Sequence, residues 1–271
     1  YVGEGRRRLE DTVRTDELPT AARARALNGA TAMALEAGDV ATGRLRAEEA
    51  LELHRALGDA SGTANSVLLL GNVNAEEGNF AQAHELFDEC IGVFRELGDE
   101  HYTLLATRLL AWMSYELGDR ERAQALHEEV VRRARVLGNE RMQATSLGAL
   151  AEYALYEDRV QDAVLMLKES TRIYSDLGER HEIGVNLCRF ARAFAVEGRA
   201  GMAAQVFARA EALREEIGAR EYTWIAEMNE GTLAIIRTQL DEAAFDEAWE
   251  QGRALTVDEA VALALDTEPD A

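Results

Sequence analysis

Three pairs of adjacent glutamates that lie in expected helices, and five histidines, are among the side chains of this chain whose types could do chemistry. Paired carboxylates can serve as a general acid and a general base, and clustered histidines can hold a metal ion. The pairs are Glu48-Glu49, Glu128-Glu129 and Glu215-Glu216, and the histidines are His54, His84, His101, His127 and His181. The pairs lie in helix-forming segments and indicate solvated surfaces. The histidines lack ligand spacing and are expected to be ordinary surface or groove residues.

The sequence lacks four common motifs of catalytic and metal-binding sites. It holds no phosphate-binding GxxxxGKS or GxxxxGKT loop and no HExxH, CxxC or GxSxG motif. An enzyme would therefore need a site that no motif indicates, and nothing in the sequence suggests a substrate. We expect no catalytic residues, no metal and no cofactor, and we interpret the chain as a binding or regulatory protein.

The composition is that of an acidic chain without export or membrane signals. Its 29 Lys and Arg residues against 50 Asp and Glu residues give a net charge of −21, which disfavours nucleic acid and anionic lipid as partners. Cys90 and Cys188 lie in apolar helical patterns and are expected to be buried thiols in a reducing compartment. There is no signal peptide and no run of about 18 apolar residues. We expect a cytoplasmic protein, and the start at Tyr1 indicates a segment of a longer one.

A triplet of Leu, Gly and Asp returns every 40 residues and sets the organisation of the chain. The series runs through Leu57-Gly58-Asp59, Leu97-Gly98-Asp99, Leu137-Gly138-Asn139, Leu177-Gly178-Glu179 and Ile217-Gly218-Ala219. A second series lies halfway between, at Ala37-Gly38-Asp39, Glu77-Gly78-Asn79, Leu117-Gly118-Asp119, Glu157-Asp158-Arg159 and Glu197-Gly198-Arg199. Such a period indicates a solenoid of stacked repeats.

Each Gly-Asp or Gly-Asn step marks the end of one helix and the start of the next. Glycine adopts the left-handed conformation after a helix, and Asp or Asn caps the N–H groups of the following helix. The only prolines, Pro19 and Pro269, lie near the ends, and no segment alternates as a strand does. The sequence therefore predicts an all-α protein, folded as a right-handed α-solenoid of antiparallel helix pairs.

Two helices per repeat place the whole chain, residues 1–271, in a single repeat domain. An N-terminal helix is expected over 4–15, followed by repeats over about 20–57, 60–97, 100–137, 140–177 and 180–217. Closing helices are expected over 221–238, 242–252 and 256–265. The first helix of each repeat is called the A helix and the second the B helix. Small residues let the two approach closely where they cross, at Gly71, Ala111, Ala151, Ala191 and Gly231 on A and at Gly43, Ala83, Ala123, Ala163 and Ala203 on B.

The small residue late in helix A, the Gly-Asp turn and the alanine five residues after its glycine resemble the tetratricopeptide repeat. Gly71, Gly78-Asn79 and Ala83 carry the pattern once, and Ala111, Gly118-Asp119 and Ala123 carry it again. The common repeat has about 34 residues, whereas the step of 40 residues here is similar to a long-helix subtype. Arrays of that subtype occur in bacterial signal-transduction ATPases, including maltose-regulator-like transcription factors, and in peptide-sensing quorum regulators.

Both ends of the chain resemble the ends of such arrays in actinobacterial, LuxR-type regulators. The C-terminal resemblance covers Phe245 to Thr256 and the following Asp258-Glu259-Ala260-Val261, and the N-terminal one covers Glu4-Gly5-Arg6-Arg7-Arg8-Leu9-Glu10. The resemblance implies that the full protein carries an ATPase domain before the repeats and, often, a DNA-binding helix-turn-helix domain after them.

Ligands of tetratricopeptide arrays usually lie on the concave face that the A helices form. The resemblance selects Asn28, Asn65, Asn72, Arg108, Trp112, Tyr115, Glu152, Tyr156, Arg189, Arg192 and Asn229 for that face. Asparagine can pair with a peptide backbone, arginine can bind a carboxylate through a forked contact, and Trp or Tyr adds apolar area. The chaperone-tail clamp of some family members needs lysines here, but the only lysine, Lys168, lies on a B helix.

Three functions remain open on the sequence alone. The first is a sensor and scaffold domain of a transcriptional regulator, in which an effector or partner in the groove acts on the protein's own ATPase and DNA-binding domains. The second is a stand-alone adaptor for a peptide or protein, including a sensor of quorum peptides. The third is an enzyme. The repeats and the C-terminal segment favour the first.

Overall fold

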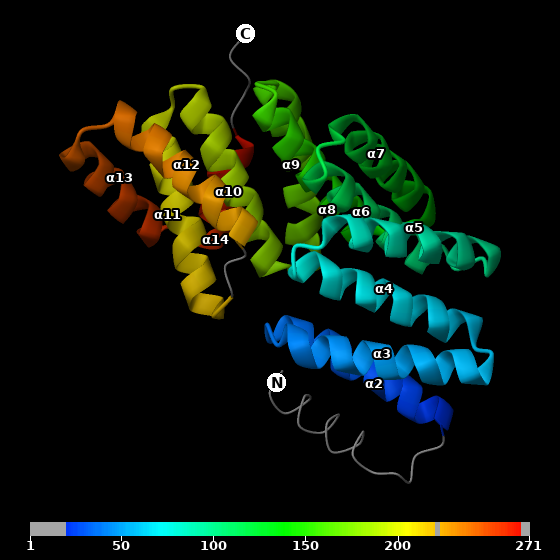
Figure 1. The fold of residues 1–271 in the computed structure, drawn as a ribbon. Coiled ribbons are helices and arrows are strands. Elements are labelled where there is room, and N and C mark those ends of the chain that lie inside the picture. The colour runs from blue at the N-terminus through cyan, green and yellow to red at the C-terminus, as the bar shows by residue number, and fades with distance from the viewer. Residues whose placement is uncertain (1–19, 220–222, 267–271) are drawn as a thin grey trace. The chain divides into compact units, whose positions relative to one another are not determined.

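Thirteen α-helices and no strand make up the part of the chain that the computed structural model describes, residues 20–219 and 223–266 (Figure 1). The A helices are α2 (Thr20–Glu36), α4 (Ala60–Glu76), α6 (Glu100–Glu116), α8 (Glu140–Tyr156), α10 (Arg180–Val196) and α12 (Thr223–Gln239). The B helices are α3 (Val40–Leu57), α5 (Phe80–Glu96), α7 (Arg120–Leu137), α9 (Val160–Leu177) and α11 (Ala200–Ile217). Two further helices follow, α13 (Glu242–Ala254) and α14 (Val257–Leu265). The predicted all-α repeat fold is confirmed, whereas the helix expected over 4–15 lies outside the described residues.

The Leu-Gly-Asp triplet ends one helix and starts the next by the expected chemistry. Gly58 has a φ of 66°, and its N–H donates to the carbonyl of Arg55 at the end of α3. The side chain of Asp59 accepts a hydrogen bond from the N–H of Gly62 at 2.9 Å and so caps α4. Leu57 is 44% exposed, so the leucine of this triplet lies at the surface rather than in the core.

Four described turns depart from this pattern, because the helix after each has no side-chain cap: those at Asn79, Asp158-Arg159, Glu179 and Arg199. Asp158 stands where the other turns have glycine, and its φ of 57° is the only positive value for a non-glycine residue in the described chain. A side chain in this conformation costs about 1 kcal/mol. The side chain of Asn79 does not cap α5, and its amide nitrogen donates to Glu77 at 3.1 Å. The turn geometry is therefore kept even where the residue that favours it is missing.

The chain divides into two compact units, Tyr1–Val130 (unit 1) and Val131–Ala271 (unit 2). Within unit 1, α2 packs on α3, α3 on α4, α4 on α5 and α5 on α6. Phe87 and Phe94 of α5 are fully buried in its core. A Cβ on Gly71 of α4 would lie 2.4 Å from Cε1 of Phe87, so the absent side chain makes room for the ring. The small residue at this A–B crossing is thus a packing requirement.

Both cysteines are buried and neither forms a disulfide, as the apolar patterns around them indicated. Burial raises the pKa of the Cys90 thiol to about 12. Because the thiolate is the reactive form of cysteine, Cys90 is inert near neutral pH.

Unit 2 repeats the pairing, with α8 on α9, α9 on α10 and α10 on α11. The helix α13 packs along α11, and α14 contacts α9, α10 and α11 (Figure 1). The ring of Phe245 stacks on that of Trp249, with centroids 5.4 Å apart. Trp249 also lies 6.0 Å from the ring of Phe207, a buried residue of α11. The last two helices, α13 and α14, therefore pack as part of the core of unit 2.

Candidate functional site

The residues expected to face a ligand lie on A helices of both units, and each unit is considered by itself. Unit 1 carries Asn28 on α2, Asn65 and Asn72 on α4, and Arg108, Trp112 and Tyr115 on α6. Unit 2 carries Glu152 and Tyr156 on α8, Arg189 and Arg192 on α10, and Asn229 on α12. We call these two sets the unit 1 surface and the unit 2 surface.

Two asparagines of the unit 1 surface bind neighbouring A helices. The Oδ1 atom of Asn28 on α2 accepts a hydrogen bond from the hydroxyl of Ser66 on α4 at 2.9 Å. The Nδ2 atom of Asn65 on α4 donates to the hydroxyl of Tyr102 on α6 at 2.9 Å. Both side chains are therefore held by structural contacts, which leaves them fewer donors and acceptors for a ligand.

The remaining residues of the unit 1 surface are half-buried. Trp112 packs against the core of unit 1, and its indole N–H donates to Glu116 at 2.9 Å. Arg108 lies one turn before Trp112, and Tyr115 follows it in the last turn of α6. Asn72 forms no side-chain hydrogen bond with any described residue. Trp112 and Asn72 are thus the clearest places on this surface for contact with a partner.

The expectation that the histidines lie on the surface or in the groove is wrong for His54 and His127, which are 1% and 3% exposed. The Nδ1 atom of His54 lies 2.9 Å from Oδ2 of Asp59. Its ring packs against Gly62, where a Cβ would be 2.0 Å from Nδ1. The N–H of Gly62 and, after it, the His54 side chain lower the pKa of Asp59. His54 can be buried because Asp59, the N-cap of the following helix α4, provides a polar partner.

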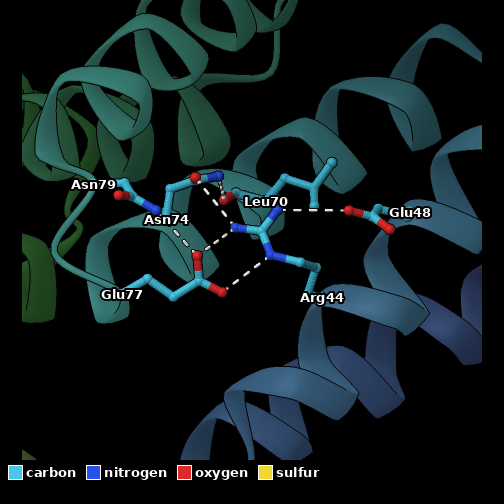
Figure 2. Close-up of polar contacts among 6 residues, drawn as sticks. All are labelled: Arg44, Glu48, Leu70, Asn74, Glu77 and Asn79. Atoms are coloured by element: carbon cyan, nitrogen blue, oxygen red, sulfur yellow. Dashed lines mark hydrogen bonds and ion pairs between the residues drawn. The ribbon is translucent and has the colours of Figure 1, made fainter.

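A polar cluster that the sequence reading did not identify joins α3 to α4 in unit 1 (Figure 2). Arg44 donates from Nε to one carboxylate oxygen of Glu77 at 3.0 Å and from Nη2 to the other at 2.6 Å. Nη2 also donates to Oδ1 of Asn74 at 3.2 Å, and the Asn74 amide donates to the carbonyl of Leu70 at 2.7 Å. This pairing raises the pKa of Arg44 and lowers that of Glu77. Since each member is held by another, the cluster is a crosslink between helices.

A comparison of equivalent positions in the repeats shows how this cluster could have been predicted from the sequence. Asn74 stands where later A helices carry Ser114, Ala154 and Phe194, and Arg44 stands where later B helices carry His84, Gln124, Val164 and Ala204. The asparagine and the arginine that one repeat has and the others lack do not serve the repeat fold in general. Such residues mark contacts that belong to one place in the array.

Arg189 and Glu152 of the unit 2 surface form a nearly buried ion pair between α10 and α8. Arg189 donates to Oε2 of Glu152 from Nε at 3.1 Å and from Nη2 at 2.9 Å, and the side chains are 9% and 14% exposed. Its Nη1 atom donates to Oδ1 of Asn186 at 3.2 Å. Gly148 makes room for the guanidinium, because a Cβ there would be 2.8 Å from Nη1. Both charges therefore find partners within the protein.

Hydrogen bonds continue from this pair into the core of unit 2. The Nδ2 atom of Asn186 donates to the hydroxyls of Ser170 at 2.9 Å and Thr171 at 3.1 Å. The Ser170 hydroxyl donates to the carbonyl of Ala144 at 2.9 Å. All these side chains are buried. The network fixes the position of Arg189, so Arg189 and Glu152 hold α8 and α10 together.

Arg192 and Tyr156 differ from that pair because they keep polar atoms without a partner. The guanidinium of Arg192 lies 5.0 Å from the centroid of the Tyr156 ring. Its Nε atom is buried without a hydrogen bond, and no described residue forms an ion pair with Arg192. Tyr156 is 42% exposed, and partial burial raises the pKa of its hydroxyl. Asn229, the last residue of this surface, is 5% exposed.

A pocket between α10, α11 and α12 of unit 2 is too small for a drug-sized effector. Its volume is about 30 Å³, room for only a few water molecules. Small-molecule sites typically span about 300–1,000 Å³. His181, Cys188 and Asn229 are among its lining residues. Unit 2 therefore offers a partner the outer faces of its helices rather than this pocket.

Two other kinds of site are not found in the described part of the chain. No group of three or more His, Cys, Asp or Glu side chains is placed there to hold a metal ion. No helix within residues 20–219 and 223–266 is both long and apolar enough to cross a lipid bilayer.

The paired helices, their glycine turns and the small residues at their crossings correspond to a known repeat. Residues 67–135 match the tetratricopeptide repeat family. This stretch of tetratricopeptide repeats includes Trp112 and Asn72 of the unit 1 surface. Tetratricopeptide arrays are protein-interaction scaffolds that bind partners along an extended surface. No curated protein matches the sequence significantly.

Two solved structures share this tetratricopeptide arrangement. BtubC from P. vanneervenii superposes with a TM-score of 0.62 and 16% sequence identity, over 82% of this chain and 91% of its own. A signal-transduction ATPase with numerous domains from Pyrococcus horikoshii, which has a tetratricopeptide repeat sensor, superposes with a TM-score of 0.58 and 13% identity. That match covers 90% of this chain and 40% of the ATPase. At these identities the likeness is one of fold.

Proposed function

We propose that this chain is the non-catalytic sensor domain of a larger bacterial transcriptional regulator and binds a peptide or protein segment on its A helices. Two adjacent positions of the A helices carry the proposal. The first position holds Gly71, Ala111, Ala151 and Ala191. The second position holds Asn72, Trp112, Glu152 and Arg192. From α4 to α10 the first position is therefore always small, and its neighbour changes in charge, size and polarity from helix to helix.

These adjacent positions have different tasks. Ala111, Ala151 and Ala191 are 0% exposed, and a larger side chain would not fit at the helix crossing. The residue that follows each of them lies further around the helix and is half-buried. A constant interior beside a varied surface is how a repeat scaffold can select one partner without changing its fold.

Two observations support the link to a regulator. The ATPase of Pyrococcus horikoshii combines a similar array, as its sensor, with further domains. The segment from Phe245 to Thr256 resembles the end of the array in such regulators. In a regulator of this kind, a partner that binds the array more tightly in one state than in another shifts the ATPase domain toward that state.

Selection from a phage-displayed library of random peptides tests the binding function. We expect the 271-residue chain to enrich a common motif, and the Trp112→Ala substitution to weaken binding of the corresponding synthetic peptide about tenfold or more. Leu45→Ala is the matched control, because Leu45 is 60% exposed on the B helix α3. Circular dichroism verifies that both variants fold. Equal affinity of Trp112→Ala and wild type would remove the unit 1 surface from the proposal.

A stand-alone adaptor is the second candidate, and the 91% coverage of BtubC favours it. The coding sequence on either side of this chain separates the two functions. An upstream phosphate-binding loop supports the regulator, whereas an isolated reading frame supports the adaptor. In a full-length regulator, deletion of residues 20–266 should abolish or release the response to the effector. An unchanged response would contradict the sensor function.

A further inference from the structure

We propose that Arg192 and Tyr156 form a subsite for one carboxylate of the bound peptide, an Asp or Glu side chain or the C-terminus. The inference rests on the proposed binding function and names the chemistry of the partner in unit 2. It follows from a positive charge that the protein itself does not neutralise, on a chain with a net charge of −21.

The contacts of Arg192 leave its charge available. Its guanidinium lies 5.0 Å from the centroid of the Tyr156 ring, which stabilises a cation but does not neutralise it. Its Nε is buried without a hydrogen-bond partner, and no described residue forms an ion pair with it. A guanidinium that lies over an aromatic ring still has N–H groups at the edge of its own plane. These N–H groups can bind a carboxylate through two parallel hydrogen bonds.

Other arginines of unit 2 in similar surroundings are paired. The pairs are Arg159 with Glu157, Arg189 with Glu152, Arg199 with Glu197, Arg209 with Glu216 and Arg214 with Glu211. Each of these arginines is half-buried or buried, as Arg192 is. Removal of an arginine from water is unfavourable unless a counter-charge compensates. The missing counter-charge at Arg192 is the one that a partner can bring.

The acidic residues around Arg192 do not provide the missing counter-charge. Glu152 is one turn before Tyr156 on α8, but its Oε2 atom accepts two hydrogen bonds from Arg189. Glu227 on α12 is close enough to act on the hydroxyl of Tyr156, yet it forms no ion pair with Arg192. These two negative charges also favour a singly charged ligand group over a phosphate, which would need more than one cation.

Gly231 of α12 places no side chain against Arg192. Even an added Cβ at this position would remain 3.7 Å from Nη1 of Arg192, which is ordinary van der Waals contact. Tyr156, whose ring the guanidinium contacts, is 42% exposed. A carboxylate can therefore approach the guanidinium while its own carbon chain packs on the exposed part of the Tyr156 ring.

A peptide pair that differs by one charge tests the subsite. Peptides selected on the whole chain from a random phage-displayed library should be enriched in Asp, Glu or a C-terminal carboxylate. The best one is synthesised together with its amide analogue, and both are titrated by fluorescence anisotropy. We expect Arg192→Gln to weaken binding of the acid peptide about tenfold or more and to change binding of the amide peptide little.

Control variants separate this subsite from other effects. Arg172→Gln changes an exposed arginine on the B helix α9 and should leave both affinities unchanged. Arg192→Lys keeps the charge but loses the fork, so it should recover only part of the affinity. Equal stability of the variants in thermal unfolding shows that the fold is intact.

Three results would overturn the inference in distinguishable ways. Selected peptides without an acidic preference, or an acid peptide that binds Arg192→Gln as tightly as wild type, would refute the subsite. In both cases binding that depends on Trp112 would leave the proposed function standing. Failure of the chain to select any peptide would refute the proposed function and the subsite together.

Discussion

Gly252 of α13 lies directly against the backbone of Gln205 in α11. A Cβ at position 252 would sit 2.2 Å from the carbonyl oxygen of Gln205 and 2.6 Å from its Cα. Backbone atoms cannot move aside as the end of a side chain can, so the two helices would have to separate. The side-chain amide of Gln205 also donates to Gln251 at 2.7 Å. The end of α13 is therefore seated on α11 at a single residue without a side chain.

We expect Gly252→Ala to lower the free energy of unfolding of unit 2 by roughly 1–3 kcal/mol, because the added methyl group overpacks this contact. Urea denaturation followed by circular dichroism measures the change. The control is Gly92→Ala in the middle of α5, where no atom lies within 4 Å of an added Cβ. That substitution should raise stability by up to about 1 kcal/mol, since alanine favours helix. Equal stability of the two variants would contradict the close seating of α13.

Asp158→Gly should stabilise the protein by roughly 0.5–1 kcal/mol. The φ of 57° at this turn strains any residue with a Cβ, and glycine relieves that strain. Glu157→Gly is the comparison, because Glu157 has a φ of −99° and gains nothing from glycine. Thermal unfolding of both variants would show an increase in Tm for Asp158→Gly and a decrease for Glu157→Gly. A decrease for both would mean that the Asp158 side chain contributes more than its backbone costs.

Arg189→Met should destabilise unit 2 by roughly 3 kcal/mol, because it leaves Glu152 nearly buried without its counter-charge. Glu152→Gln in the same background should recover part of the loss, and the double-mutant cycle gives the coupling between the two groups. The pair Arg135–Glu169 is the control, with side chains 51% and 41% exposed. Its disruption should cost about 0.5 kcal/mol or less. Similar losses for both pairs would contradict the structural importance of burial at Arg189.

Asp59→Asn should reduce stability near neutral pH and change its dependence on acid. The pKa of the Asp59 carboxyl is lowered from its usual 3.8, mainly by the N–H of Gly62. The carboxylate therefore stabilises the fold above that usual value and ceases to do so as pH falls through the folded pKa. We expect the stability difference between wild type and variant to shrink as pH is lowered from about 5 to 2. Denaturation at a series of pH values measures it, and a constant difference would refute the coupling.

The helix boundaries could be predicted from the sequence because they depend on local chemistry. Gly58 and Asp59 end and start helices through their own φ angle and their own side-chain bond. The capping rule failed at Asn79, whose side chain does not cap α5 and donates to Glu77 instead. The packing of α13 on α11 could not be predicted. Gly252 lies outside the 40-residue repeats, so no repeated pattern indicates its contact with Gln205.

The candidate site was predictable only as a set of positions on the A helices. Whether a side chain is available to a partner depends on residues in adjacent repeats. Arg189 is held by Glu152, 37 positions earlier, whereas Arg192 on the next turn is not paired. The opposite charges of Arg189 and Glu152, separated by about one repeat length, were a sequence signal from which their ion pair could have been predicted. His54 shows the same limit, since its burial depends on a cap residue that the histidine itself does not reveal.

The constant turn between helices has an evolutionary consequence. The turns at Gly58, Gly98, Gly138, Gly178 and Gly218 lie 40 residues apart and share one backbone conformation, with φ between 61° and 69°. Recombination within the gene can therefore duplicate, delete or reorder modules while the junctions still fold. Such an exchange would carry Trp112 or Arg192 to a new neighbour and leave the alanines beside them in their places. An array with exchanged modules would thus present a different surface to partners over the same interior.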